Sequence, residues 1–198
     1  MNLKASHPIH GFYMSYAAYI GAWLLAAVMA FLLAFAAPSE SRVMGHLPAL
    51  LSHNLKDQPV ALPQGLPSDR TLALITFKRG QRPQVEGWVN WVKNLNQAAP
   101  DAVNWMRVSV VNDPGTDGAR GEVWSRLLEK YPSDAERANF VPVFTNHASF
   151  VRASGFSGTD QVMAVVLNRQ GDVLARAEGP FDADKAQSLL ETLQSTAF

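Results

Sequence analysis

The chain has 198 residues, with 17 lysines and arginines against 17 aspartates and glutamates, so its formal net charge is +0. This length allows one ordinary domain with an appendage, and the balanced charge gives no electrostatic footprint for nucleic acid as a partner. The sequence has no cysteine, which excludes disulfides, thiolate nucleophiles and cysteine-based metal sites.

The N-terminal region predicts a membrane anchor. After a short tail, residues 1–10, the segment 11–37 is almost continuously apolar and carries no formal charge. A helix needs about 20 apolar residues to cross the hydrocarbon core of a bilayer. A cleaved signal peptide is the alternative, because Ala34-Phe35-Ala36 resembles a cleavage site, but the apolar region of a signal peptide runs only about 7–15 residues. We therefore expect an uncleaved, single-pass anchor in the lipid bilayer.

The side of the membrane follows less directly from the charges. Lys4 lies before the anchor and Arg42 after it, so counting positive charges nearly gives a tie. A short tail inside and a large C-terminal domain outside is the common arrangement. We expect a bacterial-type inner-membrane protein whose C-terminal domain is periplasmic.

Residues 38–69 separate the anchor from the folded domain. They are punctuated by prolines, which predict a Pro-rich, extended tether. A short helix over residues 44–51 is the one element that its middle part allows. These prolines are Pro38, Pro48, Pro59, Pro63 and Pro67.

Strand and helix patterns alternate through residues 70–198. We expect the first two strands to pair in parallel through a right-handed crossover, and the last two strands to pair antiparallel as a hairpin. The fold class is therefore α/β, with a thioredoxin-like mixed sheet flanked by helices. The predicted strands are 72–77, 105–111, 162–167 and 173–177, with an extended piece at 140–144, and the predicted helices are 84–96, 121–131, 147–154 and a last one capped by Asp182.

Two stretches of this domain carry a family resemblance. Residues 141–193 resemble the tail of peroxiredoxin-like domains, with turns closed by Gly171 and Gly179. Together with "TLALITFKRGQRPQVEGWVNWV", residues 71–92, they look most like the thioredoxin-like assembly-factor family of the mitochondrial ATP synthase. The resemblance implies a non-catalytic, chaperone-like role in building a membrane protein complex, with subunits of that complex as partners.

The same resemblance locates the place where redox chemistry would sit. Where thioredoxins have F-W-A-x-W-C-G-P-C, this chain has Phe77-Lys-Arg-Gly-Gln-Arg-Pro-Gln-Val85. Arg82 falls at the attacking cysteine and Val85 at its resolving partner. Thiol–disulfide exchange and a peroxidatic thiol are thereby excluded, and we expect no enzymatic activity, no catalytic residue, no metal and no cofactor.

Four residues in or near the segment 77–85 are candidates for partner binding. Lys78, Arg79 and Arg82 form either a solvated loop tip before a helix or a basic patch that docks an acidic segment or a lipid headgroup. Trp88 falls at core spacing in the helix that follows, whereas Trp91 projects to one side of that stripe. Trp91 is either covered by the tether or exposed for a partner.

The favoured hypothesis is a membrane-anchored, redox-inactive thioredoxin-like protein that serves as an assembly factor or accessory subunit of an energy-transducing complex, respiratory or ATP synthase. A periplasmic carrier of haem, metal or lipid is one alternative. The other is a cysteine-independent enzyme with a pocket built from Arg79, Arg82 and Glu178. No positive motif supports either alternative.

Overall fold

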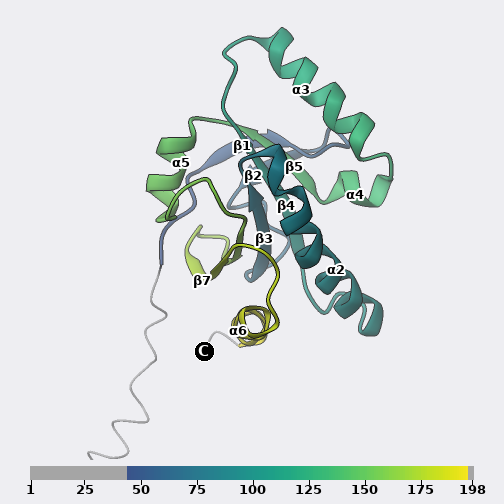
Figure 1. The fold of residues 1–198 in the computed structure, drawn as a ribbon, viewed down its shortest axis with the longest axis vertical. Helices are drawn as coiled ribbons and strands as arrows, with labels where there is room; N and C mark the ends of the chain where they lie inside the picture. The colour runs from purple at the N-terminus through teal and green to yellow at the C-terminus, as the bar shows by residue number, and fades with distance from the viewer. Residues whose placement is uncertain (1–43, 196–198) are drawn as a thin grey trace, which may run out of the picture. The chain divides into compact units, whose positions relative to one another are not determined.

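A five-stranded sheet organises residues 44–195, the part of the chain that the computed structural model describes (Figure 1). Its spatial order is β5-β4-β3-β6-β7. The strands β3, β4 and β5 run parallel to one another, while β6 is antiparallel to both β3 and β7. The bounds are β3 (Thr71–Thr76), β4 (Trp105–Val111), β5 (Phe140–Phe144), β6 (Met163–Leu167) and β7 (Val173–Glu178).

These pairings confirm the predicted parallel crossover and the predicted C-terminal hairpin. The segment 140–144, predicted only as an extended piece, is a full edge strand paired with β4. Pro142 lies in this strand opposite Ser109, a position that proline tolerates because an edge strand has one side without ladder hydrogen bonds.

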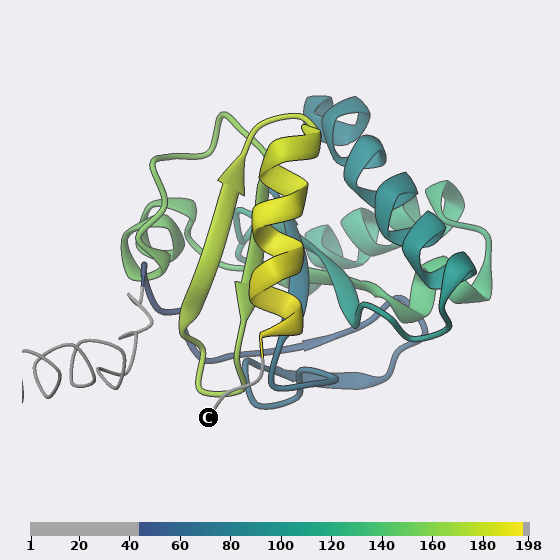
Figure 2. The same cartoon turned by 90° about the horizontal axis from the view of Figure 1, so that it is seen from below.

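Helices cover the sheet and its β5 edge. Figure 2 shows α6, in yellow, lying along the sheet, with α2 beside it. Four of the five helices observed over residues 82–194 were predicted, and α4 is the one that was not. The helices α2 and α3 begin earlier than the hydrophobic periodicity indicated, because Pro83 and the Thr116 cap set their starts. The bounds are the 3₁₀ turn η1 (Arg79–Gln81), α2 (Arg82–Ala98), α3 (Asp117–Lys130), α4 (Asp134–Ala138), α5 (His147–Ser154) and α6 (Ala183–Gln194).

One face of the sheet packs against α2 and α6 around Trp88. The Trp88 side chain is fully buried, at 0% exposure, beside Leu72 and Leu74 of β3 and Leu189 of α6. Its indole Nε1–H donates a hydrogen bond to the carbonyl of Gly179 (3.0 Å), so the buried polar atom is satisfied. The predicted core role of Trp88 is confirmed.

The other face is covered by α5 and by residues 44–66. Leu47, Leu62 and Leu66 pack into the same buried cluster as Ile75 of β3 and Phe150 of α5. Within this segment, β1 (Leu50–His53) and β2 (Pro59–Leu62) form an antiparallel hairpin.

The backbone of this segment is tied to β7 and to the turn before it. The Met44 N–H donates to the Val173 carbonyl (2.9 Å), and the Leu47 N–H donates to the Gly171 carbonyl (2.7 Å). The predicted tether is therefore wrong over residues 44–69, and so is the short helix at 44–51, because the second face of the sheet needs an apolar cover and these leucines supply it. Pro59 is the first residue of β2 and Pro63 follows its last residue, so these two prolines bound a strand rather than mark a spacer.

The predicted anchor, residues 11–37, lies outside the described residues. Among residues 44–195, no helix combines the length and apolarity that a membrane crossing requires.

The packing of residues 44–66 predicts that they are required for folding. A chain that starts at residue 44 is expected to unfold cooperatively in urea, whereas a chain that starts at residue 70 leaves one sheet face bare and should lack a cooperative transition. Within the full domain, Leu62→Ala should lower the free energy of unfolding by about 2–5 kcal/mol through loss of a buried side chain.

Leu51→Ala is the matched control, because Leu51 sits in the same hairpin at 89% exposure. Its effect should stay within about 0.5 kcal/mol. Cooperative unfolding of a chain that starts at residue 70, with the stability of the longer chain, would show that the segment is an appendage after all.

Gly87 provides a second test of the packing. A Cβ added at Gly87, inside α2, would lie 2.8 Å from the Cβ of Phe181, whose ring packs 5.3 Å from the Trp88 ring. In a helix interior, alanine is more stabilising than glycine by about 1 kcal/mol. Gly87→Ala should nevertheless lower the urea midpoint, because α2 and the segment that carries Phe181 would have to move apart. Gly121→Ala in α3, where an added Cβ would meet no atom within 4 Å beyond its chain neighbours and its own helix backbone, should raise the urea midpoint. Equal stabilisation by both substitutions would contradict this packing.

Candidate functional site

The corner, residues 77–85, joins the end of β3 to α2 and is fixed by one buried amide. The Gln81 side chain is 3% exposed. Its Oε1 accepts hydrogen bonds from the N–H groups of Phe77 (2.7 Å) and Lys78 (3.1 Å), and its Nε2 donates to the carbonyl of Thr159 (2.8 Å). The amide therefore ties the corner to the loop that precedes β6. Nothing in the local sequence pattern indicates this role for Gln81.

Arg82 and Val85 hold the two positions that cysteines occupy in thioredoxins. Arg82 is the first residue of α2, and its Nε lies 3.4 Å from Oε1 of Glu86, one helical turn later. This carboxylate offsets the unfavourable placement of a cation at the positive end of the helix dipole. Val85 is fully buried against β3 and β6. The corner thus offers a guanidinium and a buried methyl pair where thiol chemistry would require two sulfurs.

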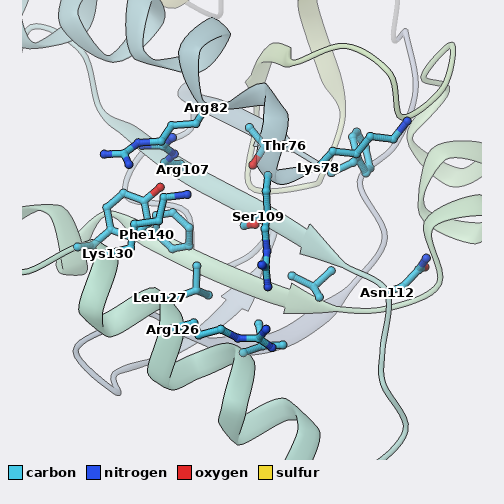
Figure 3. Close-up of a pocket in the computed structure, with 15 residues that line it drawn as sticks. Thr76, Lys78, Arg82, Arg107, Ser109, Asn112, Arg126, Leu127, Lys130 and Phe140 are labelled. Atoms are coloured by element: carbon cyan, nitrogen blue, oxygen red, sulfur yellow. The ribbon is translucent and has the colours of Figure 1, made fainter.

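A cavity of about 350 Å³ separates the corner from α3 (Figure 3). Fifteen residues line it, and none of these described residues is acidic. An apolar wall includes Phe77, Val111, Leu127 and Phe140. The cationic lining residues are Lys78, Arg79, Arg82, Arg107, Arg126 and Lys130.

The fold thus unites two groups of cations that are far apart in the sequence. Lys78, Arg79 and Arg82, the predicted basic patch, do lie together at the corner. Arg107 comes from β4, and Arg126 and Lys130 come from α3, all missed by sequence analysis. The one signal available was Arg107 itself, an arginine inside an otherwise apolar strand pattern.

Arg107 is buried and incompletely paired. The residue is 7% exposed, and its Nη1 lies 3.3 Å from Oε1 of Glu86. Its guanidinium carbon lies 5.2 Å from the centre of the Tyr131 ring and 5.6 Å from that of Phe140, within cation–π range. Its Nε is buried without a hydrogen-bond partner among the described residues. A buried cation with a free donor is costly unless an anion completes its bonding.

The pKa of Lys130 is affected by its burial and by the positive charges around it. Burial lowers the pKa of the Lys130 ammonium, and the cations of Arg82, Arg107 and Arg79 lower it further, while Glu86 acts in the opposite direction. A lowered lysine pKa means that the folded cavity disfavours the charged form of Lys130. An anion in the cavity would raise this pKa again.

The remaining predicted residues lie elsewhere. Trp91 is half-buried on α2 and packs against the rings of Trp88 (6.0 Å) and Phe181 (6.2 Å), so the turn before α6 flanks it rather than a tether. Glu178 accepts a hydrogen bond from the Ser157 hydroxyl (2.7 Å) and does not line the cavity. The hypothetical enzyme pocket of Arg79, Arg82 and Glu178 is therefore not assembled.

No group of three or more histidines, aspartates or glutamates within residues 44–195 is placed to hold a metal ion.

Comparisons with known proteins identify the fold. No protein-family model matches the sequence, and no curated protein matches it. Among solved structures, the chain is similar to BsSco, described as a member of the Sco family of cytochrome c oxidase assembly proteins, with 14% identity, TM-score 0.50, and 75% of this chain and 93% of that chain covered.

Two further structures have the same fold. One is an SCO1/SenC family lipoprotein from Bacillus anthracis str. Ames, with 13% identity, TM-score 0.52 and coverage of 77% and 97%. The other is a protein from Aquifex aeolicus VF5, assigned provisionally to electron transfer, with 12% identity, TM-score 0.54 and coverage of 77% and 98%. At these identities the likeness establishes the fold alone, and the described domain is thioredoxin-like.

The bonding of Gln81 predicts a local stability effect. Gln81→Ala removes the acceptor of two buried N–H groups and should lower the free energy of unfolding by about 1–3 kcal/mol. Amide hydrogen exchange at Phe77 and Lys78 should accelerate, while exchange in α6 should follow only the global change. Gln81→Glu keeps the acceptor and loses the donor to Thr159, so protection at Phe77 should persist. Unchanged exchange at both amides in Gln81→Ala would rule out this role.

Proposed function

We propose that this protein is a membrane-anchored, redox-inactive thioredoxin-like protein that assists the assembly of an energy-transducing membrane complex or belongs to it as an accessory subunit. The observation that carries the proposal is the corner. It is held in a fixed geometry by Gln81, yet Arg82 and Val85 occupy the positions of the two thiols. A corner that has the thioredoxin-like geometry but no cysteines is suited to binding a partner.

Three other observations support the proposal. BsSco has the same fold and is described as a member of a family of cytochrome c oxidase assembly proteins. A second structure of this fold is described as a lipoprotein, which agrees with a domain held at a membrane. The sequence adds the predicted anchor at 11–37 and the resemblance to ATP-synthase assembly factors. On this proposal the domain is periplasmic and its partners are subunits of the complex.

The contact surface of the proposal is the exposed side of the corner. Lys78, Arg79 and Arg82 are exposed, and their charge suits an acidic segment of a membrane protein subunit. Trp91 and Phe181 form a separate aromatic pair on α2 and the turn before α6, and Phe181 is 37% exposed. This pair is the second candidate contact.

A ligand carrier is the alternative that the cavity favours. Its volume of about 350 Å³ falls in the range of small-molecule pockets. The cationic lining is unsuited to a metal cation and suited to an anionic group.

Crosslinking in membranes tests the contact function. A photoreactive residue at Gly80, in the corner, is expected to trap subunits of one membrane complex, whereas the same residue at Gln187, exposed on α6, should not. Lys78→Glu with Arg79→Glu should reduce the Gly80 adducts about tenfold or more, because like charges oppose docking of an acidic segment. Both side chains are exposed, so thermal stability should change little.

Deleting the protein should also lower the amount of the assembled complex, with rescue by the wild type and not by the charge-reversed variant. Adducts that are the same at both positions, or that match only the abundance of membrane proteins, would contradict the proposal.

A further inference from the structure

We infer that the cavity between the corner and α3 binds a small organic phosphate. The inference concerns the purified protein and requires no protein partner, so it goes beyond the proposed assembly function. It rests on the charge of the lining, on the incomplete bonding of Arg107 and on the apolar wall.

The lining holds more positive charge than the fold neutralises. Six cations line the cavity, and their ion pairs within the described residues involve two carboxylates, Glu86 and Asp160. Four positive charges remain around one space. Folding has to overcome this repulsion, and an anion with two or more negative charges would remove it. On a solvated surface, cationic side chains can reduce their repulsion by moving apart. Here Arg107 and Lys130 are held in place by their packing against Tyr131.

Arg107 gives the second, independent observation. It is nine-tenths buried, it lines the cavity, and its Nε has no hydrogen-bond partner among the described residues. The rings of Tyr131 and Phe140 hold its guanidinium in place. A preorganised guanidinium fork matches the oxygens of a phosphate, and one such oxygen would satisfy the free Nε.

Further features favour a phosphate attached to an organic body over a bare ion. α2 begins at the edge of the cavity with Arg82, and no side chain caps this N-terminus, so its dipole adds to the attraction for an anion. On the opposite side, Figure 3 shows Leu127 of α3 beside Phe140. A bare phosphate would leave this wall unused, whereas an ester would place its organic part there.

Two sources share this chemistry. One is a soluble phosphate ester, and the other is the headgroup of a phospholipid. Both would place a phosphate between Arg107, Lys130 and the corner, so the experiment has to separate them.

The test uses the full-length protein purified in a neutral detergent. Calorimetric titrations with phenyl phosphate represent the soluble ester, and titrations with dihexanoyl phosphatidic acid, which is also a phosphomonoester, represent the lipid headgroup. We expect at least one to bind with a dissociation constant below about 1 mM, weakening as salt is raised. Tighter binding of phenyl phosphate indicates the soluble source, and tighter binding of the short-chain lipid indicates the membrane source.

Variants connect the binding to the cavity. Lys130→Gln, and Arg107→Lys, which keeps the charge but loses the fork, should each weaken binding about tenfold. Arg152→Gln is the control, because Arg152 is exposed on α5 and does not line the cavity. If Arg107→Lys fails to fold, Lys130→Gln and Arg126→Gln suffice.

Three results would overturn the inference: no binding of either probe, equal weakening by Arg152→Gln, or equally tight binding of benzoate in place of phenyl phosphate. Failure of the crosslinking experiment on membranes would leave this result untouched, because no partner takes part in the titration.

Discussion

The buried amide of Gln81 is the interaction on which the corner depends. Where β3 ends, the chain leaves the sheet and starts a helix within a few residues, so the N–H groups of Phe77 and Lys78 need other acceptors. The Gln81 side-chain oxygen accepts from both N–H groups, and its side-chain N–H donates to the Thr159 carbonyl. An amide has no redox state and does not titrate near neutral pH. The bonds that hold the corner in place therefore do not change with oxidation or with pH near neutrality.

In the cavity beside the corner, by contrast, the polar groups are not all satisfied within the described residues. Its cations are assembled against their mutual repulsion, and burial together with this repulsion lowers the pKa of Lys130. The rest of the domain supports this arrangement through the buried sheet and the satisfied Trp88 core. Departures from locally favourable electrostatics tend to mark functional sites, since structure alone gives no reason to keep them.

Local patterns predicted much of the fold, and long-range packing decided the rest. The strand at 105–111 and the helix at 147–154 have the predicted bounds, because period and caps are properties of neighbouring residues. Residues 44–66 were misjudged because their prolines are local, whereas the burial of Leu47 and Leu62 depends on a sheet formed much later in the chain. The cations of the site also fall into those that local sequence could predict and those that only the fold brings together. Three of its cations adjoin in sequence, but only the fold brings Arg107 and Lys130 to them.

The two proposed activities are linked through charge. Lys78, Arg79 and Arg82 are exposed at the edge of the cavity, while Arg107 is buried within its lining. A phosphate bound at Arg107 would cancel part of the positive potential that the proposed acidic partner segment would recognise at the corner. Ligand and partner would then oppose each other, and thermodynamic linkage requires each to weaken the other by the same factor. A domain without sulfur chemistry would in this way still have two states, distinguished by occupancy of the cavity rather than by oxidation of a thiol pair.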